Sequence, residues 1–110
     1  MRKTDKVLSL LSIAMKAGKV VSGETSTEAA VKSFQAYLGL VAEDASDNTR
    51  KHFTDMCNYR EIPIITYSTR EELGRAIGKD YRSNLAVTDE GLADAIVKAM
   101  ESRKKEEESI

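Results

Sequence analysis

The stretch most suited to binding or chemistry is residues 18–34, where a glycine, a short predicted strand and a second glycine lead directly into a predicted helix. Gly23 allows a sharp turn, and the first turn after it is rich in hydroxyl groups that can bond free helix N–H groups. Thr25 followed by Glu28 matches a capping box. Such a helix start offers N–H donors and a positive dipole end. It can bind a phosphate, or it can be a capped junction without a ligand.

The other chemistry-bearing residues form no catalytic set. Glu43 and Asp44 follow a predicted strand, where carboxylates can bind magnesium, but the first predicted strand ends without the further acids of such a site. We therefore interpret them as structural. His52 and Cys57 are five residues apart on one predicted helix and so point about 140° apart. With one cysteine and one histidine, we predict no disulfide and no metal site. Because no catalytic set is present, we also predict no cofactor and no enzymatic activity.

The composition is that of one globular domain, since 41% of the 110 residues are hydrophobic and 32% are charged. No apolar run approaches the about 18 residues of a membrane span, and residues 8–15 lack a signal-peptide cleavage site. We predict a cytoplasmic protein with no membrane partner. The net charge is −1, yet residues 1–20 hold five basic residues and one acidic residue. This asymmetry permits an anionic partner near the N-terminal part of the fold.

Hydrophobic periodicity alternates between helix and strand along the chain. The predicted helices cover 4–16, the segment from Gly23 to Phe34, the segment opened by Ser46, the segment from a capping box at Ser68 and Glu71 to Gly78, and 89–100, and the predicted strands cover 19–22, 36–42, 62–67 and 85–87. This order predicts an α/β fold, a three-layer α/β/α sandwich over a four-stranded, at least partly parallel sheet. Residues 1–100 are expected to form a single domain, and 101–110 a frayed helix end or charged C-terminal tail.

The predicted core consists of apolar residues on these stripes and strands: Leu8, Leu11, Val31, Leu40, Val41, Phe53, Ile64, Leu73, Val87 and Ile96. In the second helix, Thr27, Ala30, Val31 and Phe34 share one stripe at helical spacing. We expect all four to face the core.

Several sequence blocks, in one order, resemble a known family. They include residues 17–23 (AGKVVSG), 40–49 (LVAEDASDNT), 76–79 (AIGK) and 87–91 (VTDEG). Over about residues 4–100, the chain is similar to the YlxQ-type bacterial branch of the kink-turn RNA-binding ribosomal protein family. The resemblance implies a sandwich with a mixed sheet, and a non-enzymatic monomer that binds structured RNA, with ribosomal RNA among the candidate partners.

The resemblance also implies an RNA face made of the glycine junction, the end of the second strand and the loop before the last helix, with the junction and this loop on a common edge. The implied RNA-binding residues are Lys19, Gly23, Glu24, Thr25, Ser26, Lys32, Thr88, Asp89, Glu90 and Gly91. The chain departs from the family at Ala29, where relatives often carry a lysine, and at Phe34, where glycine is common. The alternative is a protein-interaction module that kept the fold and lost RNA binding.

Overall fold

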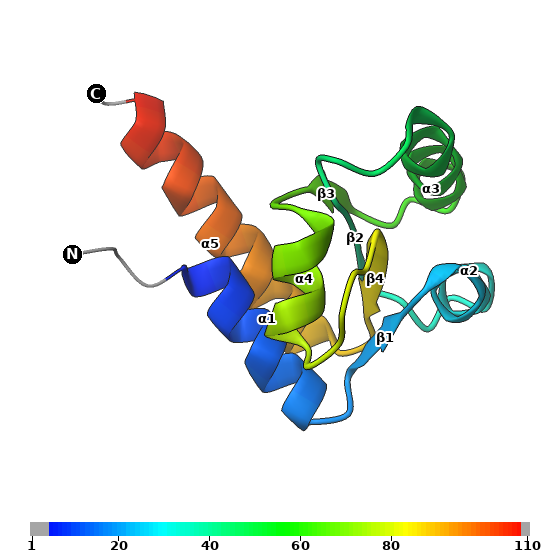
Figure 1. Cartoon of the computed structure of the whole chain (residues 1–110), viewed down its shortest axis with the longest axis horizontal. Helices are drawn as coiled ribbons and strands as arrows, with labels where there is room; N and C mark the ends of the chain where they lie inside the picture. Colours follow the sequence, from blue (N-terminus) through cyan, green and yellow to red (C-terminus); the bar gives the residue numbers. More distant parts are fainter. Residues whose placement is uncertain (1–4, 109–110) are drawn as a thin grey trace.

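The computed structural model describes residues 5–108, with side chains over 5–104. Helices and strands alternate along this part of the chain (Figure 1). In chain order they are α1 (Lys6–Lys16), β1 (Val20–Ser22), α2 (Glu24–Lys32), β2 (Leu38–Val41), α3 (Asp47–Tyr59), β3 (Ile64–Thr66), α4 (Arg70–Ala76), β4 (Asn84–Val87) and α5 (Glu90–Glu108).

The strands form one mixed sheet in the order β1-β4-β2-β3. β2 pairs with β3 in parallel, whereas β4 pairs with both β1 and β2 in antiparallel orientation. One face of the sheet is covered by α1, α4 and α5, and the other by α2 and α3 (Figure 1). The predicted three-layer α/β/α sandwich is therefore confirmed, and so is the central position of β2, whose four residues are all buried.

Each face of the sheet packs against its own hydrophobic cluster. Eight of the ten predicted core residues are at most 1% exposed, and the other two, Leu8 and Ile64, are partly buried against the same clusters. The helical stripes were thus assigned to the correct faces. Burial of these side chains is the main favourable contribution to folding.

Three of the predicted helices begin with a side-chain cap close to the predicted start. Two of these caps lie at the predicted residue, and the third lies one residue later. Ser46 Oγ accepts from the Thr49 N–H at 3.1 Å, and Asp89 Oδ2 accepts from the Leu92 N–H at 2.9 Å. Both caps lie at the start of a predicted helix. The capping box predicted at Ser68 is displaced by one residue.

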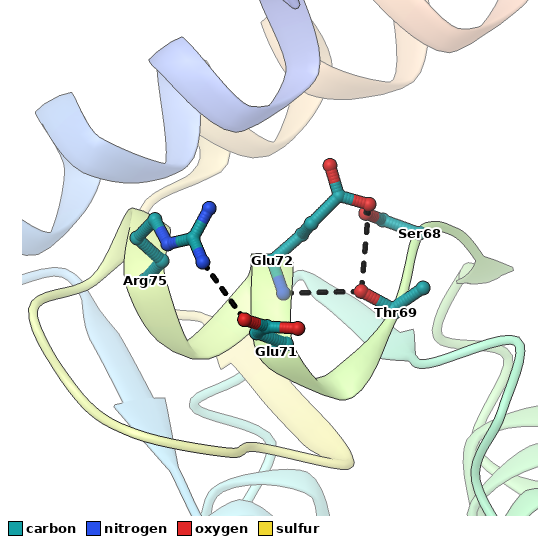
Figure 2. A network of polar contacts seen from close by, with 5 residues as sticks. All are labelled: Ser68, Thr69, Glu71, Glu72 and Arg75. Carbon is teal, nitrogen blue, oxygen red and sulfur yellow. Dashed lines mark hydrogen bonds and ion pairs between the residues drawn. The ribbon is translucent and has the colours of Figure 1, made fainter.

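Figure 2 shows the polar network at the start of α4, where Thr69 is the cap. Thr69 Oγ1 accepts from the Glu72 N–H at 3.1 Å, and the Ser68 hydroxyl donates to the Glu72 carboxylate at 3.0 Å. Ser68 itself has a φ of 63° and therefore cannot be the extended residue that precedes a helix. Glu71 instead pairs with Arg75 one turn later, at 2.9 Å (Figure 2).

The prediction that Phe34 faces the core is wrong. The α2 helix ends at Lys32, so the helical period that places Thr27, Ala30 and Val31 in the core does not reach Phe34. Phe34 instead follows the helix cap with a φ of 60°, and 66% of it is exposed. A large side chain thus occupies a left-handed position that favours glycine.

The segment predicted as a helix end or tail is helical as far as the structure describes it, because α5 continues to Glu108. Met100 packs on the edge of the core, and the guanidinium of Arg103 lies 5.5 Å from the centre of the Tyr67 ring. These contacts attach the second half of α5 to the domain. Residues 109–110 of the predicted tail lie outside the described part of the chain.

Leu11 and Ile13 test the core assignment on a single helix. Leu11 is fully buried, whereas Ile13 is 54% exposed. Leu11→Ala should lower the free energy of unfolding by about 2–5 kcal/mol because it leaves a cavity. Ile13→Ala should change it by less than about 0.5 kcal/mol. Urea denaturation measures both, and equal losses would show that α1 packs through another face.

Phe34→Gly tests the left-handed position. Glycine adopts a positive φ without the about 1–2 kcal/mol penalty of other residues, although it also makes the unfolded chain more flexible. The free energy of unfolding should therefore stay unchanged or rise by up to about 1 kcal/mol. A loss of about 3–5 kcal/mol, as for a buried phenylalanine, would contradict the exposed placement.

Candidate functional site

The predicted site residues lie at two opposite ends of the sheet, because β1 and β4 are antiparallel. The Gly23 N–H donates to the Asn84 carbonyl at 3.4 Å, at the start of β4. The Thr88 N–H donates to the Lys19 carbonyl at 2.8 Å, at the other end. The four residue-to-residue steps from Lys19 to Gly23 span about 13 Å of strand. The expectation that the glycine junction and the loop before the last helix share an edge is therefore wrong.

The end that carries the glycine junction keeps four of the predicted residues together: Gly23, Glu24, Thr25 and Ser26. Lys19 and the segment 88–91 lie at the far end. Gly91 has ordinary backbone angles, and a Cβ there would meet only Asp89 Oδ2, at 3.5 Å, so this position does not require glycine. Asp89 itself caps α5, which gives it a structural role.

Lys32 is placed in the last turn of α2, away from the glycine junction. Its ammonium lies 2.6 Å from the Glu28 carboxylate, which also faces His52 at 3.5 Å. Hydrogen bonds from Lys32 and His52 lower the pKa of Glu28. Lys32 is thus already paired with a carboxylate and is less available to an anionic ligand than an unpaired cation would be.

At the junction end, the loop after β1 and the loop before β4 enclose a hollow of about 310 Å³, which we name the β1–β4 hollow. It lies between the two loops and the start of α3. Its lining residues are Ser22, Gly23, Glu24, Thr49, Tyr81, Arg82, Ser83 and Asn84. The site is therefore built by residues 60 positions apart in the sequence, such as Ser22 and Arg82.

The cation of this hollow is Arg82. Its Nε–H donates to Ser22 Oγ at 3.1 Å, its Nη1 donates to the Tyr81 carbonyl at 2.8 Å, and its backbone N–H donates to the Arg70 carbonyl at 3.0 Å. These bonds hold the guanidinium beside the end of β1. Among the side chains of residues 5–104, no carboxylate forms an ion pair with it. An oriented guanidinium that is not ion-paired to a carboxylate suits an anionic ligand such as phosphate.

Asn84 adds hydrogen-bonding capacity that the fold does not use. It lines the hollow, only 3% of it is exposed, and its Oδ1 has no hydrogen-bond partner among the described residues. A buried, unpaired polar atom carries a desolvation cost of about 1–3 kcal/mol.

The start of α2 supplies backbone donors to the same hollow. Gly23 is the residue before the helix, with a φ of 87°, and within the described chain no side chain caps the first turn. The capping box predicted at Thr25 and Glu28 is therefore wrong, because Thr25 already lies inside the helix. The uncapped first-turn N–H groups and the positive helix end remain available to an anion.

Sequence analysis missed the role of the loop between α4 and β4. A Cβ at Gly74 would lie 1.6 Å from the Asp80 carbonyl oxygen, so this loop crosses α4 at a place where only glycine fits. The Lys79 N–H also donates to the Gly74 carbonyl at 2.8 Å. The available signal was a pair of glycines, Gly74 in the last turn of α4 and Gly78 two residues after its end.

Asp44, the second of the two acids after β2, is structural, as predicted. Asp44 Oδ1 accepts from the Arg70 N–H at 2.8 Å and so fixes the start of α4. Across the side chains of residues 5–104, no three His, Cys, Asp or Glu residues gather where they could hold a metal ion.

Cys57 is buried, and that burial raises the pKa of its thiol. None of the helices within residues 5–108 is long and apolar enough to cross a membrane.

The structure is a small α/β/α sandwich with a polar hollow where two loops meet at one edge of a mixed sheet. The model of the ribosomal protein L7Ae/L30e/S12e/Gadd45 family matches residues 5–97, and the chain belongs to this family.

Two relatives carry the name RNA-binding protein YlxQ. The protein from Bacillus subtilis is 44% identical over 92 residues, which cover 84% of this chain and 92% of the relative. The protein from Enterococcus faecium is 36% identical over 88 residues, which cover 80% and 84%. These identities support the YlxQ-type branch that the sequence blocks indicate.

Two solved structures share the fold. A Bacillus halodurans protein of unknown function superposes with a TM-score of 0.86 at 34% identity, covering 89% of this chain and 99% of that one. The Giardia lamblia 15.5kD RNA binding protein superposes with a TM-score of 0.75, covering 88% and 83%. At 18% identity, the second likeness concerns the fold alone.

Gly74→Ala tests the packing that positions Arg82. The new methyl group must displace the Asp80 backbone, so the variant should lose about 1–3 kcal/mol of unfolding free energy. Gly91→Ala is the matched control, since its methyl group makes only an ordinary contact and should cost less than about 0.5 kcal/mol. Urea denaturation compares them, and a stable Gly74→Ala variant would show that the loop does not rest on α4.

Proposed function

We propose that this chain is a non-enzymatic protein that binds structured RNA of the kink-turn type through the β1–β4 hollow. We further propose that it acts as a monomer in the cytoplasm, in a ribosome-associated setting. The membership of the family and the names of the YlxQ relatives support RNA as the partner. The exposed start of α2 supports the predicted residues Gly23, Glu24, Thr25 and Ser26 as contacts.

The observation that carries this proposal is the meeting of Arg82 and the uncapped start of α2 in one hollow. Backbone N–H groups and an arginine can hold a phosphate of the RNA backbone, while the buried Asn84 amide can bond a base edge. Such contacts recognise the shape of a bent RNA more than its sequence. Glu24 lies in the same hollow and would repel a misplaced phosphate.

The outer face of α2 differs from what the family resemblance leads one to expect. Ala29 is exposed there, one turn after Ser26, so no cation stands at this position. Arg82 lies in the β1–β4 hollow next to the start of α2 and supplies a cation there instead. We therefore propose an RNA contact centred on the α4–β4 loop, with the segment 88–91 and Lys19 outside it.

A protein-interaction module is the second candidate function, and exposed aromatic residues favour it. Phe34, Tyr37 and Tyr59 are 66%, 46% and 84% exposed. Large exposed aromatic side chains are typical of protein-binding surfaces. They flank the turns that follow α2 and α3, away from the β1–β4 hollow.

Arg82→Ala and Lys19→Ala distinguish the two ends of the sheet. Each variant removes one exposed or half-exposed cation, but only Arg82 lies in the hollow. Titration with a kink-turn RNA and a plain duplex at two salt concentrations should show weaker kink-turn binding for Arg82→Ala. The slope of log affinity against log salt should fall by about 0.7–0.9 if one phosphate contact is lost. Lys19→Ala should bind as the parent does.

Three outcomes would contradict the proposal in different ways. Equal affinity of the parent for both RNAs would exclude shape recognition. Loss of binding in Lys19→Ala alone would place the RNA at the far end of the sheet. No binding of either RNA by the folded parent would favour the interaction module.

A further inference from the structure

A second hollow, of about 230 Å³, lies where the C-terminal half of α5 crosses the ends of β2 and β3. We name it the α5 hollow, and its lining residues are Glu43, Thr66, Tyr67, Met100, Arg103 and Lys104. Three of these, Met100, Arg103 and Lys104, lie beyond the segment 5–97 that matches the family model. The site is therefore made by an extension of α5 against the shared fold.

One wall of the α5 hollow is held in place by Asp5. The Tyr67 hydroxyl donates to Asp5 Oδ2 at 2.6 Å, and the Arg103 guanidinium lies 4.0 Å from the same oxygen. The guanidinium also lies over the Tyr67 ring, 5.5 Å from its centre. Tyr67 is 7% exposed, so the ring serves as a buried support for the arginine. An oriented guanidinium offers a plane on which a flat aromatic ligand can stack.

The polar groups of the hollow include both signs. Glu43 contributes a carboxylate acceptor, while Arg103, Lys104 and Thr66 contribute donors, and Met100 contributes an apolar surface. A phosphate could pair with the two cations but would leave the Glu43 carboxylate without a donor. The edge of a nucleobase, in contrast, carries donors and acceptors side by side. The cavity is smaller than the about 300–1,000 Å³ of sites for drug-sized ligands, which suits a single base.

The two hollows are neighbours on one edge of the sheet. The Ala42 N–H donates to the carbonyl of Ser83, which lines the β1–β4 hollow, at 2.8 Å. Glu43, the next residue, lines the α5 hollow. Its own N–H donates to the Ser68 carbonyl at 2.8 Å. An RNA strand in the first hollow can therefore place a nearby nucleotide in the second.

We infer that the α5 hollow binds one unpaired guanine base of the RNA that occupies the β1–β4 hollow. Guanine offers two adjacent donors, N1–H and the N2 amino group, to the Glu43 carboxylate, and the acceptor O6 to Lys104, while its ring stacks on the Arg103 guanidinium. Uracil offers a single N–H donor on the corresponding edge. The inference rests on the proposed RNA-binding function and adds the nucleotide class that this edge selects.

Nuclear magnetic resonance on the full chain tests the inference. The Met100 methyl group and the Lys104 backbone amide report on the α5 hollow, and the Gly23 amide reports on the other hollow. The probes are guanosine monophosphate, uridine monophosphate and inorganic phosphate. Guanosine monophosphate should shift the Met100 and Lys104 signals with a dissociation constant about three- to tenfold below that of uridine monophosphate. Phosphate alone should leave them unchanged.

Three variants supply the matched comparison. Lys104→Ala and Glu43→Gln, both at exposed positions, should each weaken guanosine monophosphate binding about three- to tenfold at the Met100 signal. Lys98→Ala removes the same charge from an exposed position of α5 outside the hollow and should bind as the parent does.

Each failure has its own signature. Equal shifts from inorganic phosphate, equal affinities for the two nucleotides, or no shift of Met100 and Lys104 would overturn the guanine site even where the parent binds kink-turn RNA. Failure of the parent to bind that RNA would overturn the proposed function instead. In that case, selective shifts from guanosine monophosphate would still establish a nucleotide site on α5.

Discussion

The antiparallel pairing of β1 with β4 is the constraint on which the candidate site depends. It places the loop after β1 beside the loop before β4, so that Gly23 meets Asn84 and Ser22 meets Arg82. A parallel pairing would have joined the glycine junction to the segment 88–91 instead. The directions of neighbouring strands thus decide which loops lie at the same edge of the sheet, and the order of helices and strands along the chain does not.

The loop that carries Arg82 depends in turn on close backbone packing. The Asp80 carbonyl reaches α4 only because Gly74 has no side chain, and the Arg82 N–H bonds to the Arg70 carbonyl on the same helix. The guanidinium is therefore positioned by α4 as much as by β1. A binding group held by packed backbone loses less conformational entropy when a ligand arrives.

The second half of α5 shows how a charged segment becomes part of the fold. Its sequence has no apolar period after Met100, yet the segment is helical to Glu108 and contacts distant residues. Arg103 contacts Tyr67 at the end of β3 and approaches Asp5 at the start of α1. Neither contact involves a neighbour in sequence, so periodicity could not reveal them. They add a wall to the sheet edge that the family segment alone does not provide.

The sequence by itself determined the order of helices and strands, the faces that are buried and the family, because apolar spacing and caps are local signals. The positions of Leu11, Leu40 and Ile96 follow from spacing alone. Only the tertiary structure decided that Phe34 leaves the core, that Arg82 joins the glycine junction, and that Thr88 lies at the other end. The physical reason is that strand direction and close backbone contacts, such as that at Gly74, are relations between distant residues, and hydrophobic periodicity does not encode them.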